Sequence, residues 1–397
     1  MKRVTLLVLD GFGIGFMDDC TGVKPEDVGA NTYKHLREAV DLHIPTLYEL
    51  GLGKIVDNIG KPKAAYGKSN LAHYGADTFM GHQELMGSKP GIPKKRLMKD
   101  VGATIKTALE SHGYHVEHPI KKASILLVNG AVVIGDNLEA EKGNIINVVG
   151  DLNLVSFDEL SKIANIIRKC VDTSRVIAFG NKKTNIETIL NAVKEKSPGQ
   201  WGVDSPKANV YGDGYQVLHL GYGINYDRQF AHIAELNQIP VYRIGKTADV
   251  IQATGFKDPV VDTRSVLETY RALFRESKED SVFLVNVQET DLAGHKQDCA
   301  WYKEVLEEVD GFLSTFISEL KDDDLLIITA DHGNDPTIGH SNHTREQTPI
   351  LVVGPKVKPV SIGIRNTMAD IAATMAQYMN IDPPEYGVSF LRDIIME

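Results

Sequence analysis

The residues best suited to chemistry in this chain are a carboxylate and two imidazoles near position 332. Asp331-His332-Gly333-Asn334-Asp335-Pro336 directly follows a short apolar run at 325–329, and His343 comes shortly after. The run is apolar and β-branched, which is typical of a strand buried on both faces. In open α/β sheets, ligands bind beyond the carboxyl ends of the strands. A lone His-Asp pair is more often part of a turn, so a metal site here needs further ligands.

Two other apolar runs end in the same kind of residue. The run at 4–9 leads into Asp10, and the run at 283–287 leads to Asp291 and His295. Three expected strands therefore deliver carboxylate or imidazole groups to one edge of a sheet. The candidate metal ligands are Asp10, Asp291, His295, Asp331, His332 and His343.

These six ligands indicate two divalent cations in one cleft. Mixed carboxylate and imidazole ligands accept Mn²⁺, Zn²⁺ or Fe²⁺, whereas Mg²⁺ and Ca²⁺ prefer oxygen ligands. The set contains no cysteine, which argues against a structural zinc site. Paired metals about 3.5–4 Å apart commonly promote displacement at phosphorus. The predicted chemistry is therefore phosphoryl transfer or phosphate-ester cleavage.

The composition favours a cytoplasmic enzyme. The 397 residues are 42% hydrophobic and 24% charged, with a net charge of −10, which argues against a nucleic acid partner. Metals and local lysines or arginines would have to attract a phosphorylated substrate. No apolar run approaches the roughly 20 residues of a membrane span, and the N-terminus shows no signal-peptide pattern. The three cysteines are widely separated and indicate no disulfide framework.

Alternating strands and helices predict an α/β fold with a mostly parallel sheet sandwiched by helices. Strands are expected at 4–9, 241–244, 281–287, 325–329 and 350–353, and helices at 263–275, 301–320 and 367–379.

The middle of the chain has a different texture. A helix is expected at 158–170 with Ser156 as its N-cap, followed by a strand at 175–179. The stretch 196–226 is rich in Gly, Pro, Ser and Tyr and is expected to be a loop-rich return. We therefore expect a discontinuous core and an inserted α+β domain. The expected boundaries are 1–98 and 218–397 for the core and 99–217 for the insertion.

The order of the motifs resembles the phosphopentomutases of the alkaline phosphatase superfamily. The resemblance rests on Asp10, the 67–87 segment, the Asp291 to His295 pair and the string from Asp331 to Glu346. It implies an alkaline-phosphatase-like core with an inserted cap domain. It also implies two Mn²⁺ ions, with Zn²⁺ as the alternative. One ion is expected on Asp10, Asp331 and His332, and the other on Asp291, His295 and His343.

The resemblance also implies a reaction. The family moves a phosphoryl group between C1 and C5 of ribose or deoxyribose through a phosphorylated threonine, primed by a sugar bisphosphate. The expected partner is therefore a small phosphorylated sugar. Lys246 matches a family lysine and is expected to contact the phosphate, as are His82 and Arg345, although Arg345 could instead pair with Glu346.

Two positions depart from the family pattern. The resemblance places the nucleophilic threonine immediately before a Gly-His pair, where this chain has Met80, and a thioether cannot carry a phosphoryl ester. Thr78 is the nearest hydroxyl and the candidate nucleophile, although a helix start would turn it about 200° away from Met80. The metal-binding acid is Asp291, four residues before His295, whereas the family's acid falls on Thr290.

Three functions are compatible with these residues. The first is a phosphopentomutase-like isomerase that uses Thr78. The second is a metal-dependent phosphatase or phosphodiesterase in which a metal-bound hydroxide attacks the phosphorus directly. The third is a metal-binding homologue without turnover, which the retention of six buried acids and imidazoles makes the weakest of the three.

Overall fold

The computed structural model describes residues 1–89 and 91–396 and divides the chain into two compact units. The first unit is discontinuous and comprises Met1–Pro90 and Asn225–Glu397, whereas the second is Gly91–Ile224. The expected boundaries at 98/99 and 217/218 fall inside a helix, Met98–Ser111, and a strand, Gln216–Gly221, of the second unit. The glycine- and tyrosine-rich sequence before residue 226 obscured that strand, whose first four residues are exposed or only partly buried.

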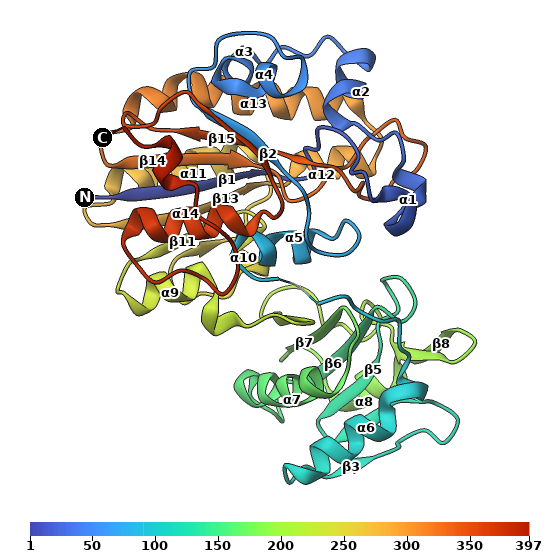
Figure 1. Ribbon diagram of the computed structural model, residues 1–397. Helices are drawn as coiled ribbons and strands as arrows, with labels where there is room; N and C mark the ends of the chain where they lie inside the picture. Colours follow the sequence, from blue (N-terminus) through green and yellow to red (C-terminus); the bar gives the residue numbers. More distant parts are fainter. Residues whose placement is uncertain (90, 397) are drawn as a thin grey trace. The chain divides into compact units, whose positions relative to one another are not determined.

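The first unit is built on an eight-stranded sheet in the order β12-β11-β13-β1-β14-β15-β2-β16 (Figure 1). β1 pairs in parallel with β13 and β14, and only β15 runs antiparallel to its neighbours. The predicted mostly parallel sheet is confirmed. Its strands are β1 (Arg3–Leu9), β2 (Ala65–Ser69), β11 (Val241–Ile244), β12 (Lys257–Asp258), β13 (Ser281–Val287), β14 (Asp324–Thr329), β15 (Thr348–Val353) and β16 (Ser361–Arg365).

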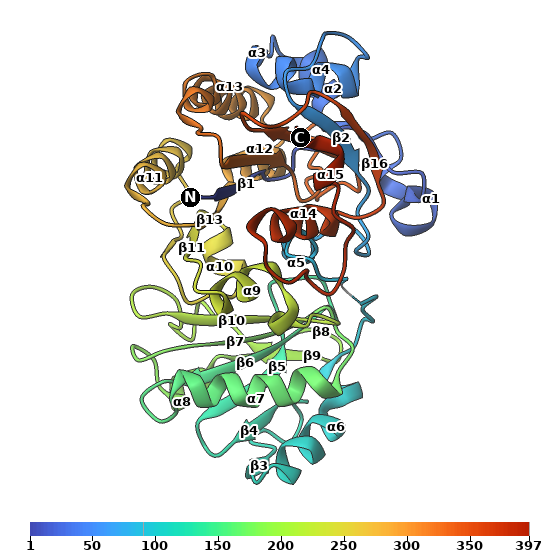
Figure 2. The same cartoon turned by 60° about the vertical axis from the view of Figure 1, so that its left-hand side comes forward.

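Alternate residues of β1 belong to different apolar clusters. Leu6 packs with residues of α9 and α14, whereas Leu7 packs with residues of α11 and α13. Side chains on a strand alternate between faces, so helices cover both faces of the sheet, as Figure 2 shows. The helices of this unit are α1 (Cys20–Val23), α2 (Thr32–Ala39), α3 (Pro45–Leu47), α4 (Gly53–Val56), α5 (Thr78–Leu85), α9 (Phe230–Leu236), α10 (Thr247–Val250), α11 (Thr263–Glu276), α12 (Glu289–His295), α13 (Cys299–Phe316), α14 (Ala369–Met379) and α15 (Leu391–Ile394).

The second unit has its own core around a six-stranded sheet in the order β10-β7-β6-β5-β4-β3, beside a two-stranded β8-β9 ribbon. The strands are β3 (Val116–Glu117), β4 (Leu126–Val128), β5 (Val132–Asp136), β6 (Ile145–Asp151), β7 (Arg175–Asn181), β8 (Val193–Ser197), β9 (Gln200–Val203) and β10 (Gln216–Gly221). The helices are α6 (Met98–Ser111), α7 (Phe157–Cys170) and α8 (Ile186–Asn191).

Some local predictions in the second unit are confirmed and one is wrong. Ser156 caps α7 by accepting from the backbone N–H of Glu159, as expected. The stretch 196–226 is not merely a loop, because it contains β9 and β10. Within the described part of the chain, no helix combines the length and apolarity needed to cross a bilayer.

Candidate metal centre

Six predicted ligands come together at one edge of the first unit's sheet. β1 lies between β13 and β14, so Asp10, the α12 residues and Asp331 follow three neighbouring strands. The ligand atoms of Asp291, His295 and His343 lie within 4.8 Å of one another. The same holds for Asp10, Asp291 and His332, and also for Asp10, His82 and Asp331.

The first of these groups has two imidazoles that face each other. His295 Nδ1 lies 2.6 Å from the carbonyl oxygen of Ser341, and His343 Nδ1 lies 3.0 Å from that of Ala76. A carbonyl oxygen only accepts, so each Nδ1 carries a proton and Nε2 is the ring nitrogen left to bind a cation. The two Nε2 atoms lie 3.0 Å apart, with Asp291 within 3.5 Å of both. Two facing Nε2 atoms beside a carboxylate fit a cation.

The acid in the group with His295 and His343 is Asp291 and not the neighbouring residue, Thr290. Thr290 directs its hydroxyl to the carbonyl oxygens of Asp10 and Val287, at 2.6 and 3.0 Å. Asn334 donates to Asp291 Oδ1 at 2.8 Å, which fixes the carboxylate's orientation. The spacing of four residues between Asp291 and His295 places both on one side of α12.

The second group leaves buried polar atoms without partners among the described residues. His332 donates Nδ1–H to the carbonyl oxygen of Gly333 at 2.9 Å, and its Nε2 has no hydrogen bond. That Nε2 lies 3.2 Å from Asp331 Oδ2 and 3.5 Å from Asp10 Oδ1, and Asp10 Oδ1 is likewise unpaired. Buried polar atoms are almost always paired. These atoms therefore fit a second cation.

Electrostatics agree with this interpretation. Burial, and then the charge of Asp331, raises the pKa of Asp10 to about 6. Burial opposes the protonation of His332, but the charges of Asp331, Asp291 and Asp10 outweigh it and raise the pKa of His332 to about 10. The buried acids therefore strongly favour the binding of a positive charge at this site, from which water is largely excluded.

Thr78 places a hydroxyl directly at this centre. It is the first residue of α5, whose N-cap Asp77 accepts from the backbone N–H of Met80 at 2.9 Å. Thr78 Oγ1 donates to Asp331 Oδ2 at 2.7 Å and lies 3.3 Å from Lys246 Nζ. The expected helix start is present, but it turns Thr78 towards the ligands and not away from them. The divergence at Met80 therefore leaves a hydroxyl at the centre.

Lys246 lies beside the carboxylates of the metal centre. Its Nζ is 2.7 Å from Asp10 Oδ2 and 3.3 Å from Asp291 Oδ2. Burial opposes its charge, but the two acids outweigh burial and raise the pKa of Lys246. The preceding Gly245 has φ of 76°, and a Cβ there would lie 2.2 Å from the carbonyl oxygen of Asn286. Glycine is therefore required for the turn that delivers Lys246.

Arg345 has partners that differ from the expected phosphate and from Glu346. Its guanidinium donates to both carboxylate oxygens of Asp19 and to the carbonyl oxygens of Leu71, His73 and Gly75. All five N–H donors are thereby used within the protein. The side chain holds the loop that leads to Thr78. Glu346 accepts from Thr32, Thr344 and Gly15.

His82 and Asn286 lie beneath Thr78. His82 is 1% exposed, and both of its ring nitrogens have partners within the protein. Asn286 was missed by the sequence analysis. The sequence did contain a signal, because Asn286 is a single polar amide in the otherwise apolar second half of β13. The structure shows that this amide is fully buried.

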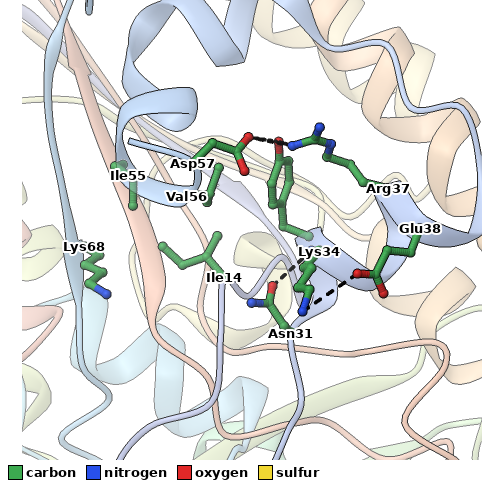
Figure 3. Close-up of a pocket in the computed structure, with 10 residues that line it drawn as sticks. Ile14, Asn31, Lys34, Arg37, Glu38, Ile55, Val56, Asp57 and Lys68 are labelled. Atoms are coloured by element: carbon green, nitrogen blue, oxygen red, sulfur yellow. Dashed lines mark hydrogen bonds and ion pairs between the residues drawn. The ribbon is translucent and has the colours of Figure 1, made fainter. Parts of the chain in front are cut away.

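A separate cavity of about 560 Å³ lies beside α2 and α4 (Figure 3). Its lining includes Lys34, Arg37 and Lys68, and Figure 3 shows Arg37 paired with Asp57 and Lys34 paired with Glu38. None of the six predicted ligands lines it. The cavity is therefore not the metal centre.

Comparison with known proteins agrees with the geometry. The sequence profile of the Metalloenzyme superfamily matches residues 2–383. Phosphopentomutase from Thermotoga petrophila is 30% identical and that from Alkaliphilus metalliredigens 29% identical, each covering 100% of both chains. A solved phosphoglycerate mutase from Leishmania mexicana aligns with a TM-score of 0.51 at 13% identity, over 100% of this chain and 98% of that chain. The last similarity shows a shared fold.

Proposed function

The chain belongs to the Metalloenzyme superfamily and, within it, to the phosphopentomutases, and from this premise we propose that Thr78 carries a phosphoryl group between C1 and C5 of ribose or deoxyribose phosphate. The observation that carries the proposal is the position of Thr78 Oγ1, 2.7 Å from Asp331 Oδ2 and 3.3 Å from Lys246 Nζ. A hydroxyl held between a proton acceptor and a cation is arranged to act as a nucleophile.

The residues present fit two metal ions, which we propose to be Mn²⁺. When bound, these ions would offset phosphate charge and favour the ionised form of a nearby hydroxyl. One set of ligands is Asp10, Asp331 and His332. The other set is Asp291, His295 and His343.

The protein's own groups suggest how the phosphoryl group moves. Phosphorylated Thr78 would give its phosphoryl group to the free hydroxyl of a sugar monophosphate. That step breaks the bond between phosphorus and Thr78 Oγ1 and forms one to the sugar oxygen, whose proton returns towards Asp331. The bisphosphate would then return its other phosphoryl group to Thr78. Lys246 would pair with the phosphoryl oxygens through both steps.

An isotope experiment separates this isomerase from a hydrolase. The purified protein with Mn²⁺ is incubated with ribose 1-phosphate and a trace of ribose 1,5-bisphosphate in ¹⁸O-labelled water. We expect ribose 5-phosphate with no ¹⁸O in its phosphoryl group, because that group passes only between Thr78 and sugar. Release of ¹⁸O-labelled inorganic phosphate as the main product would instead show hydrolysis. Absence of both products would show a homologue without this turnover.

A further inference from the structure

The hydrogen bonds of His82 fix its protonation pattern. Its Nδ1 lies 2.9 Å from the carbonyl oxygen of Thr78, and its Nε2 lies 3.1 Å from Asn286 Nδ2. The carbonyl oxygen only accepts, so Nδ1 carries a hydrogen. Nδ1 also lies 3.2 Å from Asp331 Oδ2, a second acceptor in the same direction.

The amide of Asn286 lies between the Asp10 carboxylate and the His82 ring. Its Nδ2 lies 3.0 Å from Asp10 Oδ2 as well as 3.1 Å from His82 Nε2. Exchanging the amide oxygen and nitrogen would place oxygen against the Asp10 carboxylate, which is repulsive. Nδ2 therefore donates one hydrogen to Asp10 and the other to His82. In this arrangement His82 Nδ1 donates to the carbonyl oxygen of Thr78 and Nε2 accepts from the amide of Asn286.

This arrangement removes His82 from the set of metal ligands. The ring lies close to Asp10 and Asp331 and could by distance alone hold an ion with them. Both of its nitrogens, however, are occupied by protein groups, unlike the free Nε2 of His332. In this geometry His82 has one remaining function, which is to hold the carbonyl oxygen of Thr78 through the hydrogen bond from its Nδ1.

We infer that Asn286 and His82 are positioning residues, which link Asp10 to the backbone of Thr78 and hold the Thr78 hydroxyl in line with the transferred phosphorus. The inference rests on the proposed role of Thr78. The amide holds Asp10 and the imidazole holds the first turn of α5, so one chain of hydrogen bonds sets the position of a metal ligand relative to the nucleophile. Asp10, Asn286 and His82 are buried and Thr78 is half-buried, so solvent competes little for these bonds.

Three substitutions test this chain of hydrogen bonds by different routes. Asn286→Leu keeps the volume and removes both donors, whereas Asn286→Asp keeps the shape but offers only acceptors. His82→Gln removes the ring. Because a displacement of about 1 Å can lower a rate about 100-fold, we expect kcat to fall about 100-fold in each variant while KM for ribose 1-phosphate stays within about threefold. The control is Lys99→Gln, because Lys99 is exposed on α6. Gln83→Glu cannot serve as the control, because Gln83 is buried.

Two readouts do not depend on turnover. In the metal-free full-length protein labelled with ¹⁵N-histidine, His82 should show the neutral Nδ1–H form, identified by the signal that His82→Gln removes. At saturating Mn²⁺, His82→Gln should bind as many ions as the unsubstituted protein. Should Asn286→Leu fail to fold, as judged by its thermal unfolding, Asn286→Asp carries the kinetic test.

Each contrary outcome has one meaning. An Nε2–H signal, or a lost ion in His82→Gln, would overturn the assignment of His82 as a positioning residue. Unchanged kcat in both folded Asn286 variants would overturn the proposed role of the hydrogen-bond chain from Asp10 to Thr78. If the unsubstituted protein forms no phosphothreonine, the proposed function fails, and the ¹⁵N spectrum still decides the hydrogen-bond arrangement independently.

Discussion

His295 and His343 point their Nε2 atoms at each other across 3.0 Å, although both rings already donate Nδ1–H to backbone carbonyl oxygens. The two Nε2 atoms and the nearby Asp291 carboxylate are therefore the groups left to bind a cation. The relationship is therefore the most direct structural sign that the centre is built for metal.

His295→Ala should halve the metal content. Removing one of the two facing imidazoles leaves only Asp291 and His343 to hold the ion at this position, which is too few ligands. The ligands around His332 stay intact. We expect bound Mn²⁺, measured by elemental analysis after dialysis, to fall from about two ions per chain to about one. His112→Ala, at the exposed C-cap of α6, should retain both ions. Two ions in dialysed His295→Ala would contradict the assigned ligand set.

Thr78→Val should abolish phosphoryl transfer, whereas Met80→Leu should not. Valine has the shape of threonine without the hydroxyl, so turnover of ribose 1-phosphate should fall by at least about 10³-fold. Leucine matches the volume of Met80 and should leave the rate within about threefold.

The double variant Thr78→Val/Met80→Thr tests which position faces the centre. Residues 78 and 80 lie about 200° apart on a helix, so a hydroxyl at 80 should point away from the metals and fail to restore turnover. Recovered activity in the double variant would show that the family position at 80 can serve as the nucleophile here.

Arg345→Lys should weaken the fold more than substrate binding. Lysine cannot reproduce the bidentate pair with Asp19 together with three bonds to carbonyl oxygens, and it leaves those buried carbonyls poorly satisfied. We expect the free energy of unfolding in urea to fall by about 2–3 kcal/mol. The matched change Arg264→Lys, at the solvent-accessible pair with Glu308, should leave the free energy of unfolding nearly unchanged. A raised KM with unchanged stability would instead support phosphate binding by Arg345.

The ion pair between Arg345 and Asp19 predicts that the stability of the protein depends on pH. Hydrogen bonds from Arg345 lower the pKa of Asp19 below its usual value of 3.8. A carboxyl with a lowered pKa in the folded state stabilises the protein above the unfolded-state value and loses that contribution as pH falls through the folded-state value. The stability difference between the unsubstituted protein and Asp19→Asn should therefore be full near pH 6 and shrink below about pH 4. A difference that grows on acidification would show the opposite linkage.

Strand ends could be predicted from the sequence because buried strands have an apolar pattern that stops abruptly. That pattern placed Asp10 and Asp331 at one edge, and parallel pairing of β1 with β13 and β14 then required their proximity. The direction of Thr78 could not be predicted, because it depends on where β14 delivers Asp331. The partners of Arg345 could not be predicted either, since they lie more than 250 residues away in sequence. β10 escaped notice because its exposed and buried positions give no clear alternation.

Peptide mass spectrometry tests the central claim most directly. The protein is incubated with Mn²⁺ and ribose 1,5-bisphosphate, quenched, digested and fragmented. We predict an added mass of about 80 Da on Thr78, absent from Thr78→Val and retained in Met80→Leu. An active protein with no phosphorylated Thr78, or with the phosphoryl group on another residue, would contradict the account.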